Sequence, residues 1–174
     1  MKSTLKIAAI TGVISSTFLF GFFSLGVWLN TTYGWGMQVS SIRGVGGLLS
    51  IPIQAIGIYI AMQDVKRINN SLTYGQALKT GITVAVTIAI TVAIFSFLYC
   101  TVFNTGYSDF MVNDAKKGMM AAGESPDKIK AELTGVAREF TPGMQVMQAL
   151  VGQFVTGTII SLIIGLFVKT KKAA

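Results

Sequence analysis

The sequence predicts an all-α fold, an integral membrane four-helix bundle with an extracytoplasmic helical hairpin between the third and fourth membrane helices. Hydrophobic residues make up 52% of the 174 residues and charged residues only 12%, which is far from the composition of a soluble domain. Four apolar runs are each long enough to cross roughly 30 Å of hydrocarbon as a helix, and one charged segment separates the last two. We expect the whole chain, 1–174, to form a single membrane domain.

The first predicted membrane helix covers about residues 7–29, which carry no charge and follow Lys2 and Lys6. A secretory signal peptide has a shorter apolar core, of roughly 7–15 residues, and ends in a small-x-small cleavage site that is missing here. The run is therefore predicted to be a retained helix. The polar, glycine-containing segment 30–44 then predicts an interfacial loop, with an aromatic belt of Trp28, Tyr33 and Trp35.

The second predicted membrane helix covers about residues 45–62 and contains Pro52. Proline is tolerated in a membrane helix when a neighbouring group satisfies the carbonyl that it leaves unbonded. Residues 63–79 follow as a short, polar and basic loop.

The third predicted membrane helix covers about residues 80–104. Its alternation of β-branched and small residues imitates a strand, but the absence of a turn signal over this length favours a membrane helix. Threonines recur every four residues, at Thr83, Thr87 and Thr91, and so form one stripe. Each hydroxyl can donate to the carbonyl four residues earlier, which makes the stripe internally satisfied.

The fourth predicted membrane helix covers about residues 144–168. Gly157, Ser161 and Gly165 recur every four residues and lie on one face. Small residues at this spacing allow another helix to approach closely, so we expect these three residues to pack against a helix of the same chain or of another.

The charged segment 105–143 predicts two short helices outside the bilayer. The first is expected over residues 109–122 and is ended by Gly123, and the second begins with Ser125 as its cap and Pro126 in its first turn. Its apolar residues share one face at helical spacing. This face must bury itself against the bundle, the lipid surface or a partner, and it consists of Ile129, Leu133, Val136 and Phe140.

The basic residues predict the orientation. If all four runs span, one side receives eight basic residues beside helix ends, and the other receives six, which are spread over a longer stretch and matched by six acidic residues. The positive-inside rule makes the first side cytoplasmic, with both termini inside. The eight basic residues are Lys2, Lys6, Lys66, Arg67, Lys79, Lys169, Lys171 and Lys172; the six are Arg43, Lys116, Lys117, Lys128, Lys130 and Arg138.

The composition argues against catalysis. The chain has no histidine and one cysteine, Cys100, which leaves no histidine base and no cysteine metal cluster. No nucleophile is paired with a base, so we expect no enzymatic activity, no catalytic or metal-binding residues and no cofactor. The basic residues are not interleaved with aromatic ones, which argues against nucleic-acid binding.

The order of the segments resembles the bacterial membrane family called domain of unknown function 4199. The resemblance rests on a proline-bearing second helix, on SLTYGQALKTG before the third, on GESPDKIKAEL and FTPGMQ outside, and on the terminal KTKK. It implies a small four-helix protein of the bacterial inner membrane and supplies no catalytic residues. The threonine repeat and the few charges of the outer segment depart from the family's usual pattern.

The sequence is compatible with two functions. The leading hypothesis is a non-enzymatic interaction or scaffold protein of the bacterial cytoplasmic membrane, which contacts the lipid bilayer and, through the outer hairpin, a second copy or another membrane protein. The alternative is a small channel or carrier for an uncharged or small solute. It rests on the polar groups expected inside the membrane: Gln54, Gln153 and the threonine stripe.

Overall fold

The computed structural model describes residues 2–34 and 39–170, which contain six α-helices, one π-helical turn and no β-strand. Four of the helical segments are long and apolar enough to cross a membrane, as the sequence predicts. The elements are α1 (Lys2–Tyr33), α2 (Val39–Asn69), α3 (Tyr74–Leu98), the π-helical turn η1 (Tyr99–Phe103), α4 (Tyr107–Ala121), α5 (Pro126–Glu139) and α6 (Pro142–Val168).

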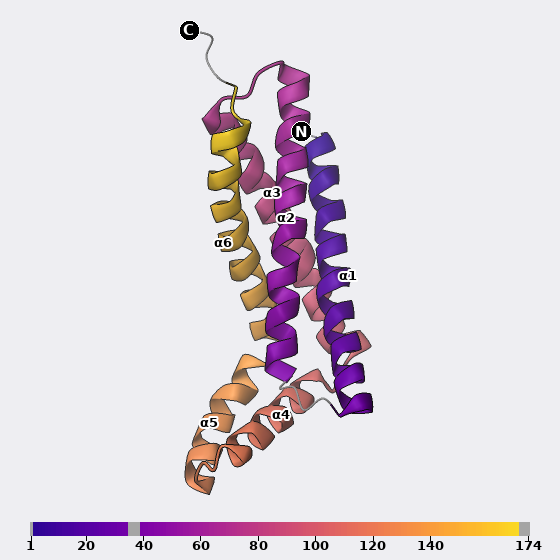
Figure 1. The fold of residues 1–174 in the computed structure, drawn as a ribbon, viewed down its shortest axis with the longest axis vertical. Helices are drawn as coiled ribbons and strands as arrows, with labels where there is room; N and C mark the ends of the chain where they lie inside the picture. Colours follow the sequence, from indigo (N-terminus) through magenta and orange to yellow (C-terminus); the bar gives the residue numbers. More distant parts are fainter. Residues whose placement is uncertain (1, 35–38, 171–174) are drawn as a thin grey trace.

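The four long helices run side by side, and α4 and α5 project beyond one end of them (Figure 1). We call this end the hairpin end, and the opposite end, where α1 begins and α6 ends, the terminal end. Helices α2 and α3 contact each other, and each also contacts both α1 and α6. The pair α2 and α3 therefore forms the centre of the bundle, and the buried core includes Ile58, Met62, Val84, Ile88 and Val92.

The connection between α1 and α2 is shorter than predicted. A loop was expected over residues 30–44, but α1 continues to Tyr33 and α2 begins at Val39. Gly34 ends α1 with a φ of +65°, whereas Gly46 lies inside α2, where a Cβ atom would lie 3.1 Å from Phe22 Cδ1 of α1. Close packing against α1 thus outweighs the weak helix propensity of glycine. Trp35 lies outside the described residues.

The connection between α2 and α3 is also shorter than predicted, because α2 continues through the basic segment to Asn69. Lys66 Nζ donates a 3.0 Å hydrogen bond to the Val168 carbonyl at the end of α6, where a cation is favoured by the helix dipole. Helix α3 then begins with a capping box in which the Thr73 hydroxyl accepts from the Gln76 amide and the Gln76 side chain accepts from the Thr73 amide.

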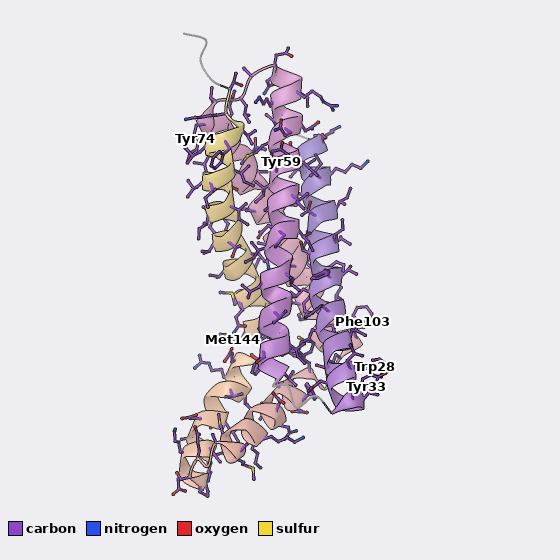
Figure 2. All side chains as sticks on the ribbon, viewed as in Figure 1. Trp28, Tyr33, Tyr59, Tyr74, Phe103 and Met144 are labelled. Atoms are coloured by element: carbon purple, nitrogen blue, oxygen red, sulfur yellow. The ribbon has the colours of Figure 1, made fainter. Side chains whose placement is uncertain are left out.

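Exposed aromatic side chains lie near both ends of the bundle (Figure 2). Trp28 and Phe103 mark the hairpin end, and Tyr59 marks the terminal end. Because Gly57 of α2 packs against Thr11 of α1, Tyr59 lies near the level of residue 9 of α1. Residues 9 to 28 of a helix span roughly 28 Å, which is close to the thickness of a hydrocarbon core. The spacing of the aromatic residues thus suits a bilayer.

Helices α4 and α5 form a helical hairpin at the positions that the sequence predicts. Ser125 caps α5 by accepting from the Lys128 amide, and Gly123 adopts a φ of +74° in the turn between the helices. The apolar face of α5 packs within the chain: Phe140 makes an edge-on contact with the ring of Tyr107 from α4, and Ile129 is buried. The base of the hairpin is therefore anchored to the bundle.

Candidate functional site

The threonine stripe of α3 is satisfied within its own helix. Thr83, Thr87 and Thr91 each donate a 2.9 Å hydrogen bond to the carbonyl four residues earlier. Thr91 also lies against Gly12 of α1, since a Cβ atom at Gly12 would fall 2.7 Å from Thr91 Cβ. This threonine therefore belongs to the α1–α3 interface.

The small residues of α6 face α3, which is its most extensive packing partner. A Cβ atom at Gly157 would lie 2.5 Å from Ala85 Cβ, and one at Gly165 would lie 3.5 Å from Ala77 Cβ. Between them Ser161 is fully buried against Gly81, and its hydroxyl donates a 2.6 Å hydrogen bond to the Gly157 carbonyl. Both helices thus contribute small residues every four positions to one close interface, which we call the α3–α6 seam.

The two glutamines expected inside the membrane meet through a backbone group. Gln54 of α2 is buried, and its amide nitrogen donates a 3.0 Å hydrogen bond to the backbone carbonyl of Gln153 in α6. Gln153 also lines a cavity near the hairpin end. The pair therefore links α2 to α6 without forming a joint amide site.

The residue that dominates this cavity is Arg43, which sequence analysis assigned to a loop. Its Nη2 donates to Gln148 Oε1 at 2.9 Å and to Gln145 Oε1 at 3.1 Å, which joins α2 to α6. The guanidinium carbon lies 5.2 Å from the centre of the Phe140 ring, within reach of a cation–π interaction. Arg43 thus joins α2 to α6 and to Phe140, the residue that follows α5, at the base of the hairpin.

The two amides are oriented by Glu139 at the end of α5. Gln145 Nε2 donates to the Glu139 backbone carbonyl at 3.0 Å, and Gln148 Nε2 lies 3.5 Å from the carboxylate oxygen Oε1 of the same residue. The same Gln145 nitrogen also lies 3.4 Å from Gln148 Oε1. Because the amide nitrogens are directed toward Glu139, the amide oxygens face Arg43.

Arg43 has unused hydrogen-bonding capacity. Both of its hydrogen bonds come from Nη2, and among residues 2–34 and 39–170 neither Nε nor Nη1 has a partner. In the same ranges the ion pairs are those of Asp64, Glu124 and Glu132, so Arg43 has no direct carboxylate counter-ion. The guanidinium consequently keeps free N–H donors, and no carboxylate pairs with its positive charge.

The cavity beside Arg43 measures about 190 Å³ and lies among α1, α2, α3, α4 and α6. Its polar lining includes Gln145, Gln148, Gln153, Ser96 and Tyr107 in addition to Arg43; its apolar lining includes Leu19, Phe20, Phe23 and Val92. A space of this size holds several water molecules or one small organic group.

Arg43 lies within the apolar level of the bundle. A Cβ atom at Gly26 of α1 would lie 2.5 Å from Ile42 Cγ2 of α2, which puts Arg43 near the level of Leu25. Leu25 is about one helical turn inside the end of the apolar run 7–29. A cation at this depth is costly to desolvate, and such residues commonly mark functional sites.

Tyr107 of α4 lines the cavity on the hairpin side. It is buried, and its ring makes edge-on contacts with those of Phe23, Tyr99 and Phe140. Burial raises the pKa of the Tyr107 hydroxyl to about 12, although the Arg43 charge opposes the shift. The hydroxyl is therefore neutral at physiological pH, and Tyr107 adds no charge to the site.

Sequence reasoning missed this site because its members come from segments that are distant in the chain. Arg43 and Gln145 are 102 positions apart, and hydrophobic periodicity carries no information about such a pair. One signal was present: the only basic residue of segment 30–44 lies three residues before Gly46, a small residue at which α1 packs closely against α2.

Comparison with known proteins links the chain to one family. The family model described as "Protein of unknown function (DUF4199)" matches residues 6–170. No curated protein and no solved structure matched the chain. Within the described residues, no group of three or more aspartate, glutamate, cysteine or histidine side chains is arranged to hold a metal ion.

Proposed function

Because the chain belongs to the DUF4199 family, whose description assigns no activity, we propose a function from its geometry: a non-enzymatic interaction or scaffold protein of the bacterial cytoplasmic membrane. The observation that supports this proposal most directly is the α4–α5 hairpin, which projects beyond the four long helices (Figure 1). A projecting element that is anchored only at its base can reach a partner without disturbing the bundle.

The outer half of the hairpin carries an open groove that would receive the partner. The groove measures about 560 Å³ and lies between α4 and α5. Its floor is apolar, and Met120 at its edge is 61% exposed. Its rim carries both charges, from Lys116, Lys130 and Glu124. An apolar floor with a charged rim is the usual anatomy of a protein contact surface, and we assign this groove to a second copy or another membrane protein.

The proposal includes an orientation, with both termini in the cytoplasm and the hairpin outside. The terminal end carries Lys2, Lys6, Lys66, Arg67 and Lys79, and Asp64 is the only acidic residue of the sequence from residue 1 to residue 104. The hairpin end balances its basic residues with acidic ones. This asymmetry supports the orientation through the positive-inside rule.

Site-specific photocrosslinking in native membranes tests the interaction role. A photoreactive residue at Met120 should give a discrete protein adduct, because this side chain lies at the edge of the groove. The same residue at Phe167, which is 83% exposed at the terminal end of α6, serves as the matched control and should give no such adduct. Recovery of monomer alone from the Met120 position would contradict the proposal.

A substitution in the groove sharpens this experiment. Leu133→Asp places a charge on the apolar floor and should abolish the Met120 adduct. Ala137→Asp introduces the same charge at an exposed position of α5 that does not line the groove, and it should leave the adduct intact. Equal effects of both substitutions would show that the groove does not bind the partner.

A small carrier or channel is the second candidate, and the cavity lined by Gln153 is the observation that favours it. Flux into liposomes should then fall for Gln153→Leu, which changes the cavity wall. It should persist for Thr87→Val, because the Thr87 hydroxyl donates to the Thr83 carbonyl of its own helix. Flux no greater than that of protein-free liposomes would remove this candidate.

A further inference from the structure

We propose that the cavity at Arg43 is a binding site for a monoanionic carboxylate or phosphate group, and that Arg43 is its principal ligand. The inference is independent of the interaction role of the hairpin, because it concerns the interior of the bundle. It rests on three observations: the unbalanced charge of Arg43, its depth, and the composition of the cavity wall.

The charge of Arg43 is held in place but not neutralised. Its neutral partners Gln145 and Gln148 bind only Nη2, and the carboxylate of Glu139 approaches the cluster through Gln148. The N–H groups on Nε and Nη1 have no partner among the described residues. Guanidinium N–H donors prefer carboxylate and phosphate oxygens, with which they form charge-assisted hydrogen bonds.

The depth of Arg43 makes an anionic ligand energetically favourable. The residue lies near the level of Leu25, inside the apolar run of α1. Arg43 is partly buried, and a cation that is partly removed from water without a counter-ion raises the free energy of the folded state. A bound anion would restore the balance in a space where the dielectric constant is low and the attraction correspondingly strong.

The cavity wall fits a small amphiphilic anion. Polar groups from Arg43, Ser96 and Gln153 line the same space as the apolar side chains of Phe23 and Val92. The charged group would lie at Arg43, and a short carbon chain or an ester would contact the apolar side. At about 190 Å³ the cavity is too small for an extended ligand, so it would accept only the head of a larger molecule.

Two sources can supply this chemistry, a soluble anion or the headgroup of an anionic lipid. Phe20 lines both the cavity and a second groove of about 310 Å³ on the α1–α3 side of the bundle. The lining of this groove is almost entirely apolar and includes Gly21, Phe95 and Phe103. Phe103 itself is 76% exposed. A lipid with its headgroup at Arg43 would find room for an acyl chain there, so the experiment includes both sources.

The soluble source is tested with the full-length protein in a neutral detergent. Its melting temperature is measured in propionate and in phosphate, with chloride at equal ionic strength as the reference. A ligand that binds only the folded state raises the melting temperature with concentration, and we expect a shift of several degrees. The lipid source is tested in nanodiscs of phosphatidylcholine with and without phosphatidylglycerol, with the same readout.

Variants separate a binding site from a purely structural contact. Arg43→Gln should abolish the anion-dependent shift, and Arg43→Lys should retain part of it, because Lys keeps the charge without the planar guanidinium. Arg138→Gln removes the same charge from an exposed position of α5 and should behave as the wild type. Gly47 also lines the cavity, and no atom lies within 4 Å of the position that a Cβ atom would take there. The side chain of Gly47→Leu should therefore occupy the site while Arg43 is left in place.

A shift in either the soluble or the lipid arm that disappears in Arg43→Gln and Gly47→Leu supports the proposal, and the responding arm identifies the source. If Arg43→Gln does not fold, Gly47→Leu and the wild type still decide. The absence of any shift in the wild type in both arms, or an equal shift in the wild type and Gly47→Leu, would overturn the anion site and leave Arg43 as a structural bridge between α2 and α6.

Discussion

At the scale of single residues, the hydrogen bond from the Gln54 side chain to the Gln153 backbone carbonyl predicts different effects for substitutions at the two positions. Gln54→Leu should lower the free energy of unfolding by about 0.5–2 kcal/mol, because an interhelical hydrogen bond inside the membrane is lost. Gln153→Leu should cost less, since the acceptor is the backbone carbonyl of residue 153 and survives the substitution. Reversible unfolding in mixed micelles measures both values. Equal losses would mean that the Gln153 side chain carries the interaction.

At the scale of elements, the α3–α6 seam predicts a position-dependent response to the same substitution. Gly157→Val should lower the free energy of unfolding by about 1–3 kcal/mol, because the new side chain meets Ala85 and the helices must separate. Gly152 lies on the same helix with nothing within 4 Å of its Cβ position, so Gly152→Val is the matched control. The difference between the two variants in thermal unfolding isolates packing from helix propensity. Equal destabilisation would contradict close packing at Gly157.

The elements also show which features the sequence could predict. The apolar runs predicted four membrane helices, and the pair Ser125 and Pro126 predicted the start of α5, because both signals are local. The loop expected over residues 30–44 was too long, because α1 continues to Tyr33 and α2 begins at Val39. A polar residue can continue a membrane helix when its side chain bonds to the helix backbone, as the Thr31 hydroxyl does by donating to the Val27 carbonyl.

The candidate site was harder to predict from the sequence than the fold. Gln54 and Gln153 could be identified as intramembrane amides, but which atom accepts the hydrogen bond depends on how α2 and α6 are rotated. Arg43 was counted as a loop cation, because its partners Gln145 and Gln148 come from the other end of the chain. Periodicity gives the face of a helix and not the neighbour that the face meets.

At the scale of the whole molecule, the orientation of the bundle can be tested by labelling single cysteines. Cys100 is buried and is the only cysteine, so Cys100→Ser provides the background. In that background Met120→Cys reports on the hairpin and Arg67→Cys on the terminal end, at side chains that are 61% and 83% exposed. A membrane-impermeant maleimide should label the first variant in intact cells and the second only after lysis, because the excess of basic residues keeps the terminal end in the cytoplasm.

The reverse labelling pattern would place the hairpin in the cytoplasm and contradict the proposed orientation. It would leave the α3–α6 seam and the Arg43 cavity unchanged, because helix packing does not depend on which end faces outward. It would, however, change where a partner of the hairpin must be sought, and it would place Arg43 toward the inner leaflet, where anionic headgroups are most abundant. The labelling experiment therefore decides the side of the membrane on which both proposed sites act.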